Sequence, residues 1–292
     1  MEFQWLNTFI TAADYGNFRR TAELLYLSQP SVTVHIKQLE KELGIQLFHR
    51  EGKKVKLTEE GKRYLVHAKR LLEVYQSGLE DLNSFSQGYS TKLTLAISPL
   101  IADTILPYVL KSYTKQHPEV EISIKIIESN DIEQAVLREE VDLGLSCLNS
   151  SNPKLICKLL SNDRVILVAP HDGIDSESAP PLDEEEVLTT NYLLTHNHPV
   201  YWDHLCRVVK GKYPSVRMMK VSQIHITKRF IIEGLGVSFL PTSTVRREFL
   251  EGRMLEVDCQ SINLPEANTY AIMKYNHSLQ KEFLKFISNY RF

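Results

Sequence analysis

The sequence is poor in the features that mark membrane, secreted and metal-binding proteins. Its 292 residues contain no apolar run of about 18 residues that would span a membrane, and the first residues lack the basic and hydrophobic regions of a secretory signal. The four cysteines lie far apart and form no Cys-x-x-Cys pair, which argues against a zinc ribbon or a thioredoxin-like site. We therefore expect a cytoplasmic protein with free thiols that binds no metal and no cofactor.

The composition is that of a folded protein, with 43% hydrophobic and 24% charged residues. The length suggests two or three domains, at about 100–200 residues for each. The net charge of -2 hides an uneven distribution, because residues 1–58 hold eight Lys or Arg against six Asp or Glu. Four of these cations lie between Arg50 and Lys56. A basic N-terminal region on an acidic remainder is compatible with nucleic-acid binding.

A helix is expected between Ser28 and Gly44. Ser28 can accept orphan amide protons, Pro30 sits where a missing N–H costs nothing, and Gly44 supplies a stop. Apolar residues recur at spacings of four, three and four, at Val32, Ile36, Leu39 and Leu43. The opposite face carries Gln29, Thr33, Val34, His35, Lys37 and Gln38. Such a face suits base edges and phosphates, although an ordinary amphipathic surface helix has the same pattern.

Two helices are expected before this one, at residues 3–15 and 18–25, the second capped by Asn17. Two helices joined by a short turn, the second with exposed polar and basic groups, form a helix-turn-helix. Residues 47–50 and 55–58 follow as two short strands around a turn with Lys53 and Lys54. A basic hairpin beside a recognition helix is a wing that touches the DNA backbone or the minor groove, the alternative being a solvated hairpin without a partner.

Several motifs occur together in a fixed order: Thr21-Ala22-Glu23-Leu24-Leu25, Leu27-Ser28-Gln29-Pro30-Ser31-Val32-Thr33, Leu39-Glu40-Lys41-Glu42-Leu43-Gly44, Leu47-Phe48 with Arg50, and Leu57-Thr58 with Gly61. On these motifs the chain resembles the LysR-type transcriptional regulators. The resemblance implies a winged helix-turn-helix that binds double-stranded operator DNA. It implies base contacts by Gln29, Pro30, Thr33 and Val34, and contacts to the DNA backbone near Arg50 and Lys53. Lys37 on the same helix and Lys54 in the turn are also expected to bind DNA.

A capping box at Thr58-Glu59-Glu60-Gly61 opens a long helix that runs to about Gly88. A seam with alternating steps of three and four follows it, at Leu65, Ala68, Leu72, Tyr75, Leu79, Leu82 and Ser86. A heptad seam of this length buries itself against a second helix, so we expect a coiled-coil linker at residues 59–90 that forms a homodimer. Packing of the helix on its own domain is the alternative. The family resemblance agrees and adds association into a homotetramer.

From Leu93 strands and helices alternate, which predicts a mainly parallel sheet covered on both faces and an α+β fold overall. Strands are expected at 93–97, 120–127, 141–147, 164–170, 192–195, 216–221 and 269–275, and helices at 102–116, 131–140, 201–209, 226–233 and 279–290. The run Gly234 to Pro241 again resembles the LysR effector domain. The resemblance implies a two-lobed α/β domain like the periplasmic binding proteins, with crossovers near residues 161–162 and 264–265.

These inferences divide the chain into three parts. Residues 1–58 are the expected winged helix-turn-helix domain, residues 59–90 the linker helix, and residues 91–292 the effector-binding domain. Its lobe I would comprise about 91–161 and 266–292, and its lobe II about 162–265.

Ligands of such sheets sit beyond the carboxyl ends of the strands. The polar groups expected there, with helix N-termini behind Ser98 and Gln223, favour a small anion such as a carboxylate. Each residue alone is also what a turn or a cap requires. The resemblance points to the same loops, and the expected effector-binding residues are Ser98, Pro99, Leu100, Ser129, Thr195, His196, Gln223 and His225.

Three functions compete on these observations. The first, which we expect, is a transcriptional regulator that responds to a small molecule and has no enzymatic activity. The second is an enzyme that uses the His196 and His198 region, because His196-x-His198 with Asp203 and His204 has ligand chemistry for zinc or iron. The third is a structural or interaction module, which leaves the basic wing unexplained. Within the family, the runs 98–103, 194–199 and 225–230 resemble those of a regulator of a citrate synthase gene.

Overall fold

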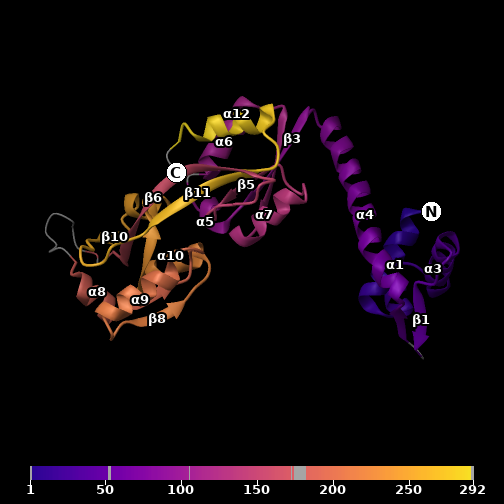
Figure 1. Cartoon of the computed structure of the whole chain (residues 1–292), viewed down its shortest axis with the longest axis horizontal. Coiled ribbons are helices and arrows are strands. Elements are labelled where there is room, and N and C mark those ends of the chain that lie inside the picture. Colours follow the sequence, from indigo (N-terminus) through magenta and orange to yellow (C-terminus); the bar gives the residue numbers. More distant parts are fainter. Residues whose placement is uncertain (1, 52–53, 105, 172, 174–181, 291–292) are drawn as a thin grey trace. The chain divides into compact units, whose positions relative to one another are not determined.

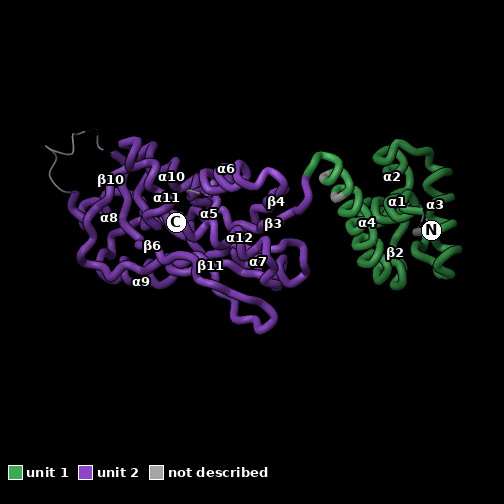
Figure 2. Tube along the Cα trace, turned by 90° about the horizontal axis from the view of Figure 1, so that it is seen from above, with its two compact units in different colours: residues 1–88 green, residues 89–292 purple. Residues whose placement is uncertain are grey.

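The computed structural model describes residues 2–51, 54–104, 106–171, 173 and 182–290. They divide between Gly88 and Tyr89 into an N-terminal unit and a C-terminal unit (Figure 2). The elements of the N-terminal unit are α1 (Phe3–Tyr15), α2 (Phe18–Leu24), α3 (Gln29–Leu43), β1 (Phe48–Glu51), β2 (Lys54–Leu57) and α4 (Glu59–Ser86). No helix in the described ranges is both long and apolar enough to cross a membrane.

The helix caps and helix ends of the N-terminal unit lie where the sequence predicts them. Gly16 ends α1 with a φ of 60°, and the side chain of Asn17 accepts the N–H groups of Arg19 and Arg20 at the start of α2. Gly44 ends α3 with a φ of 69°. A small core holds α1, α3, the hairpin and the start of α4 together, and its fully buried members include Leu6, Phe9, Leu39, Leu47 and Ala68. The expected helix-turn-helix with a hairpin is therefore confirmed.

The C-terminal unit contains a nine-stranded sheet with helices on both faces (Figure 1). Its elements are β3 (Thr91–Ile97), α5 (Pro99–Ala102), α6 (Leu106–Gln116), β4 (Val120–Ile126), α7 (Ser129–Leu137), β5 (Leu143–Ser146), β6 (Ile156–Pro170), α8 (Glu184–Thr190), β7 (Tyr192–Thr195), α9 (Trp202–Lys212), β8 (Arg217–Lys220), α10 (Ile224–Ile232), β9 (Gly236–Pro241), α11 (Thr242–Leu250), β10 (Met254–Val257), β11 (Glu266–Met273) and α12 (Ser278–Ile287).

The strand order is β4-β3-β5-β11-β6-β9-β7-β8, with β10 paired to β6. The pairs at both ends of this order are parallel, whereas β6 and β11 in the centre pair antiparallel with each other and with β5, β9 and β10. The expectation of a mainly parallel sheet is wrong in this centre. We call β3 to β5 with α5 to α7 and α12 the first lobe, and β7 to β10 with α8 to α11 the second lobe. The strands β6 and β11 run through both.

The long crossing strands explain most differences from the expected elements. The strand β6 begins at Ile156, not at residue 164, because its first half pairs with β11 and its side chains are not continuously apolar. The pairing shifts register between Thr269 and Tyr270, where β11 passes from one lobe to the other. The helices α8 and α11 and the strand β10 were not expected.

The expected helix at 102–116 is interrupted. Pro107, the second residue of α6, has no N–H to donate to a preceding turn, so a helix cannot run through it from Ala102 without a break. In the gap, Oγ1 of Thr104 donates to the carbonyl of Ile101 at 2.7 Å and accepts the N–H of Leu106 at 3.4 Å. The short helix α5 therefore ends at Ala102 and α6 starts afresh. This separation leaves α5 as an independent piece against the second lobe.

At Gly144 on β5, an added Cβ would collide with Ile132 of α7, so a glycine is needed for α7 to pack this close.

Candidate DNA-reading face and ligand cavity

The helix α3 has one buried and one exposed face. Ser28 caps it by accepting the N–H of Ser31 at 3.2 Å. The buried stripe consists of Val32, Ile36 and Leu39. The predicted DNA contacts that are exposed on this helix are Gln29, Pro30, Val34 and Lys37. They offer an amide, apolar groups and a cation together, which are groups that read base edges and bind phosphates.

Two other residues of α3 make hydrogen bonds within the unit. Thr33 is half-buried, and its Oγ1 donates to the carbonyl of Gln29 at 3.1 Å, which leaves its methyl group and lone pairs for a partner. The Nδ1 of His35 lies 2.9 Å from Oγ1 of Thr8 on α1. His35 therefore joins α3 to α1, which the sequence pattern did not show.

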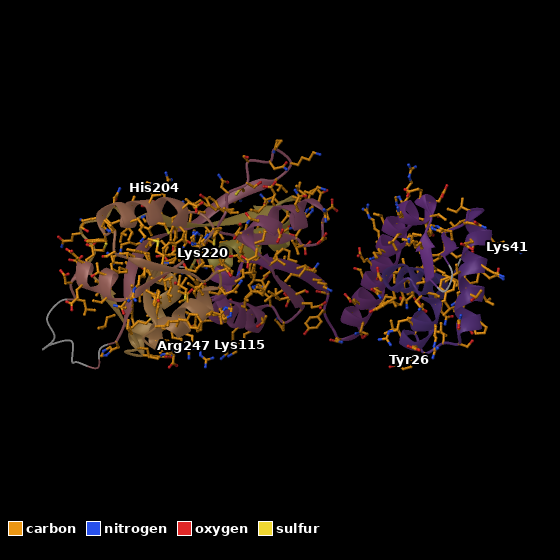
Figure 3. All side chains as sticks on the ribbon, turned by 90° about the horizontal axis from the view of Figure 1, so that it is seen from below. Tyr26, Lys41, Lys115, His204, Lys220 and Arg247 are labelled. Carbon is orange, nitrogen blue, oxygen red and sulfur yellow. The ribbon has the colours of Figure 1, made fainter. Side chains whose placement is uncertain are left out.

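The turn before α3 exposes an aromatic side chain that sequence reasoning missed. Tyr26 is 97% exposed and has a φ of 54°, a left-handed conformation that is uncommon outside glycine (Figure 3). It precedes the cap residue Ser28 by two positions. No periodic pattern marks such a residue, and only the backbone conformation singles it out.

The expected wing is a two-stranded antiparallel hairpin in which Phe48 pairs with Leu57 and Glu51 with Lys54. Phe48 is buried and lies edge-on to Phe9 and Phe18, so the hairpin is fixed to the helices. Of the predicted backbone contacts, Lys53 lies outside the described residues. Arg50 and Lys54 are placed on β1 and β2 by their backbone alone.

The seam of α4 changes partner along its length. Ala68 is fully buried and Leu65 packs against the core of the N-terminal unit. Beyond this point the apolar side chains are exposed: Leu71, Val74, Tyr75, Leu79, Leu82 and Phe85. Leu82 is 68% and Phe85 74% exposed. The packing alternative is thus correct for the first turns. Farther along, the ring of Tyr75 stacks on that of Phe3 of α1, with 3.9 Å between the ring centroids. Beyond Tyr75, the apolar side chains of Leu79, Leu82 and Phe85 stay exposed in the described structure of this unit.

In the C-terminal unit a cavity of about 120 Å³ lies between the lobes. From the first lobe it is lined by Ser98, Pro99, Leu100, Glu128, Ser129 and Cys147, and from the second by His196, Asn197, His198, Pro199, Ser222 and Ile224. No lysine or arginine is among these residues. Five of the expected effector-binding residues line it: Ser98, Pro99, Leu100, Ser129 and His196.

The other three expected residues lie outside the lining. Thr195 is buried, and its Oγ1 donates to the carbonyl of Met219 at 3.3 Å and lies 2.8 Å from Nδ1 of His196. Gln223 bridges the lobes, because its Nε2 donates to Oε1 of Glu128 at 3.0 Å. His225 is exposed on α10.

The polar groups on the first-lobe side of the cavity are uncharged donors and acceptors. The Oγ of Ser129 accepts the N–H of Cys147 at 3.2 Å, and the Oγ of Ser98 lies 3.6 Å from Sγ of Cys147. Burial raises the pKa of the Cys147 thiol, which keeps it protonated and inert. The charged exception is Glu128, which is exposed.

His198 lines the cavity on the second-lobe side and is not among the effector-binding residues that the sequence predicts. It is 4% exposed, and burial lowers the pKa of its imidazole from 6.5 to about 4, so the ring is neutral near pH 7. Its Nδ1 accepts the N–H of Val200 at 3.2 Å, which places the proton of the neutral ring on Nε2. That buried Nε2 has no hydrogen-bond partner among the described residues.

The alternative metal site does not come together. The Nε2 of His196 lies 3.8 Å from Oδ1 of the exposed Asp203, and His204 is on the surface of α9 (Figure 3). Within the described ranges, no three His, Cys, Asp or Glu side chains gather in a group that could hold a metal ion. Asn197 is also occupied, since it bonds to Thr227, Ser238 and Trp202.

Two family models match the chain: the LysR-family bacterial regulatory helix-turn-helix protein over residues 3–62, and the LysR substrate binding domain over residues 86–291. The chain belongs to the LysR family of DNA-binding transcriptional regulators. The regulator CitR of Bacillus subtilis (strain 168) is 53% identical over 292 residues and all of both chains. The uncharacterized regulator YxjO of the same organism is 38% identical, over 98% of this chain and 99% of its own.

Solved structures agree on the fold. Full-length CbnR complexed with its target DNA gives a TM-score of 0.72 at 18% identity, and DarR of Vibrio fischeri in complex with DNA gives 0.64 at 19%. Each match covers 99% of both chains. The expected fold, a winged helix-turn-helix followed by a long helix and an α/β substrate-binding domain, is confirmed for this LysR-family chain. The reading of the chain as an enzyme is not supported.

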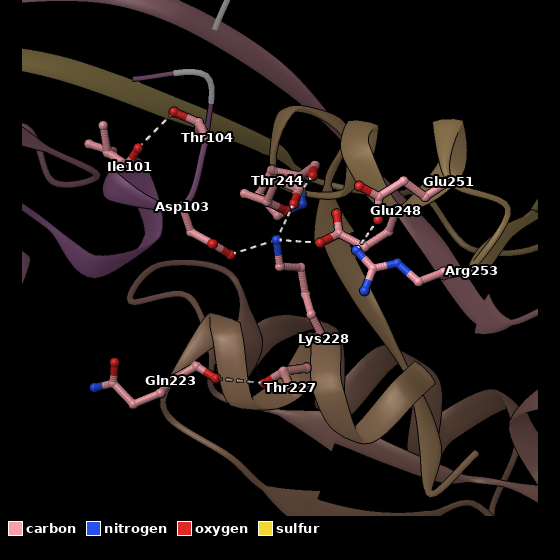
Figure 4. Close-up of polar contacts among 11 residues, drawn as sticks. Ile101, Asp103, Thr104, Gln223, Thr227, Lys228, Thr244, Glu248, Glu251 and Arg253 are labelled. Atoms are coloured by element: carbon pink, nitrogen blue, oxygen red, sulfur yellow. Dashed lines mark hydrogen bonds and ion pairs between the residues drawn. The ribbon is translucent and has the colours of Figure 1, made fainter. Parts of the chain in front are cut away.

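Figure 4 shows a charged network around the buried side chain of Lys228 in this regulator. The Nζ of Lys228 on α10 lies 2.7 Å from Oδ2 of Asp103 and 2.9 Å from Oε1 of Glu248, and it donates to the carbonyl of Thr244 at 2.9 Å. Burial raises the pKa of Asp103, and the Lys228 ammonium offsets part of this effect. The network joins the end of α5 to α10 and α11, the first two of which also border the cavity.

Proposed function

We propose that this chain binds its operator as a homodimer and changes its DNA binding when a small molecule occupies the cavity. The observation that carries the proposal is the lining of the cavity, which comes from both lobes. An occupant that contacts both lobes favours one of their arrangements over the others, and only such a difference in affinity can shift a conformational equilibrium.

DNA reading is assigned to residues 1–58. Gln29, Pro30, Thr33 and Val34 on α3 contact bases, while Lys37, Arg50, Lys53 and Lys54 contact phosphates. The exposure of the side chains on α3 and the fixed position of the hairpin support this assignment. Phosphate contacts set the register on the duplex, and base contacts supply the specificity.

Dimerisation is assigned to α4, within the linker at residues 59–90. Its second half exposes an apolar strip along a single helix, and such a strip is stable in water when a second helix covers it. Two copies of the same strip form a symmetric interface. Dimers then associate further into tetramers.

The ligand is an effector that contacts Ser98, Pro99, Leu100, Ser129 and His196 in the cavity. Thr195, Gln223 and His225 act from the surrounding shell, where Thr195 holds His196 and Gln223 links the lobes. The domain at residues 91–292 is thus a sensor with lobe I at about 91–161 and 266–292 and lobe II at about 162–265. The protein acts in the cytoplasm and catalyses no reaction.

The target is a citrate synthase gene. The 53% identity with CitR along the whole of both chains supports this target, as do the runs at 98–103, 194–199 and 225–230 that resemble a regulator of such a gene.

The test is a fluorescence anisotropy titration of the full-length protein on two duplexes. One carries the region upstream of the citrate synthase gene of the same genome, and the other is a shuffled duplex of equal length and composition. We expect tighter binding to the first duplex at every salt concentration, with both affinities falling steeply as salt rises because phosphate contacts release counterions. Equal affinity for both duplexes would contradict a specific regulator of this gene.

A further inference from the structure

The cavity has an electrostatic character that narrows the class of its ligand. Among the described residues no lysine or arginine lines it, and the buried His198 is neutral near pH 7. Two helices begin at its edge: α7, whose residue Ser129 lines the cavity, and α10, whose residue Ile224 does. The N-cap residues of both helices, Glu128 and Gln223, make no side-chain cap to the first amides.

The magnitudes favour one negative charge on the ligand. A helix N-terminus acts as roughly half a positive charge, so two of them provide about one. A first carboxylate is balanced by this field together with neutral donors. A second carboxylate finds no lysine or arginine among the described lining residues, and the other imidazole of the lining, His196, already lies 3.8 Å from the carboxylate of Asp203. The second carboxylate would also lie near the carboxylate of Glu128, at a cost in Coulomb repulsion and desolvation.

His198 supplies an independent sign of a ligand. Its Nε2 carries the proton and is buried without a partner in the described structure, whereas buried donors are rarely left unpaired. A ligand oxygen would satisfy it. Ser98 and Ser129 line the same cavity with hydroxyl groups.

The volume indicates how much of a ligand the cavity encloses. An engineered, closed cavity of about 150 Å³ accepts a benzene molecule, so about 120 Å³ encloses about six non-hydrogen atoms, and a larger ligand would extend through the open side of the cavity.

We propose that the effector is a small monocarboxylate of about this size, and that His198 is the residue that hydrogen-bonds it without adding charge. This inference rests on the proposed function, in which the cavity is the effector site. A dicarboxylate or tricarboxylate binds less well because its additional charge is repelled by Glu128, and an uncharged molecule of the same shape binds less well because it gains nothing from the helix N-termini.

The test measures binding to the full-length protein by isothermal titration calorimetry with two matched sets of probes. Lactate and butyrate are compared with their amides, lactamide and butyramide, and with malate and glutarate, which add a second carboxylate to the same skeletons. At least one monocarboxylate should bind about tenfold or more tightly than its amide and its dicarboxylate. Equal or tighter binding of a partner compound, or no binding by any probe, would overturn the proposal.

Variants separate the cavity from other sites. His198→Asn keeps an acceptor for Val200 but loses the donor at Nε2, and should weaken monocarboxylate binding by about tenfold or more. His198→Gln keeps a donor in that place and should retain most of the affinity, and His204→Asn on the surface of α9 is the control. If His198→Asn and His204→Asn bind the monocarboxylate equally, the proposed site is wrong.

The discrimination against a second carboxylate on the ligand is tested with a matched pair of glutamate variants on α7 and at its N-terminus. Glu128→Gln should improve malate or glutarate binding by about tenfold relative to the monocarboxylate, whereas Glu133→Gln on the same helix should leave the ratio unchanged. A ratio unaffected by Glu128→Gln would overturn the charge argument. Operator binding without a ligand is measured on the same samples, so failure of the ligand class is distinguished from failure of the regulator.

Discussion

The two units use their polar side chains in opposite ways. The N-terminal unit exposes its candidate contacts on the outer face of one helix, at Gln29, Val34 and Lys37. The C-terminal unit buries its own, at Ser98, Ser129 and His198, and brings them from segments far apart in the chain. A surface of the first kind fits a partner larger than the unit, such as a duplex, whereas the second kind encloses a small molecule.

Within the C-terminal unit the buried groups differ again. The ammonium group of Lys228 contacts three oxygen atoms of the protein, and these contacts link α5, α10 and α11. His198 has an unpaired donor and no charge. We therefore assign Lys228 to the stability of the fold and His198 to the binding of a ligand.

The largest effect is expected where the exposed strip of α4 must be covered. Leu79, which is 50% exposed, lies in the middle of the strip, and Leu79→Glu would put one carboxylate from each chain into the dimer interface. Each unpaired charge costs several kcal/mol to desolvate, so we expect dissociation of the dimer in sedimentation equilibrium. Leu250→Glu, at an 85% exposed position of the C-terminal unit, is the control. An unchanged dimer in the Leu79 variant would move the interface away from α4.

The second effect concerns the charged network. Lys228→Met leaves the buried Glu248 and the half-buried Asp103 without their cation and should lower the free energy of unfolding by about 3–5 kcal/mol in urea denaturation. Lys285→Met, at an exposed lysine of α12, should change it by less than about 0.5 kcal/mol. Adding Asp103→Asn and Glu248→Gln to Lys228→Met should recover part of the loss. A stable Lys228 variant would show that the network does not hold the lobes.

The contrast between the units also decides how much the sequence could predict. The caps at Asn17 and Ser28, the stop at Gly44 and the apolar spacing of α3 are local signals, and all of them formed as expected. Five of the eight residues predicted to bind the effector line the same cavity, because strand ends meet at one edge of a sheet. The sequence does not single out His198, because its proposed role depends on an Nε2 that has no partner among the described residues. That property follows from the burial of the ring and from the hydrogen bond of Nδ1 to Val200. The Lys228 network joins residues more than a hundred positions apart, which no local pattern shows.

The third effect is a loss of stability at acidic pH, because burial lowers the pKa of His198 in the folded chain. Above the ordinary histidine pKa of 6.5 the ring is neutral in both the folded and the unfolded chain. Below that value the unfolded chain takes up a proton first, and the folded ring follows only near pH 4. The free energy of unfolding should therefore decrease as the pH is lowered from the ordinary histidine value toward the folded-state value. His198 should account for about 3 kcal/mol of this decrease once the pH reaches the folded-state pKa.

The measurement is urea denaturation at several pH values between 7 and 4, for the natural protein and for His198→Asn. The stability difference between the two should shift in favour of the variant as pH falls. His204→Asn should follow the natural protein throughout. A constant difference between the natural protein and His198→Asn would show that His198 protonates freely in the folded chain.

The smallest effects are expected on the exposed face of α3, where contacts to a wet duplex replace contacts to water. Gln29→Ala should cost about 1–3 kcal/mol at one base pair of the operator and relax the preference there. Thr33→Val should change little, because the hydroxyl of Thr33 already donates to Gln29 and the variant keeps the methyl group. Lys37→Ala should weaken all duplexes alike and lower the salt slope by about one. A panel of operators with single base-pair changes distinguishes these results, and a Thr33→Val loss as large as that of Gln29→Ala would mean that the hydroxyl leaves the helix carbonyl to bind a base.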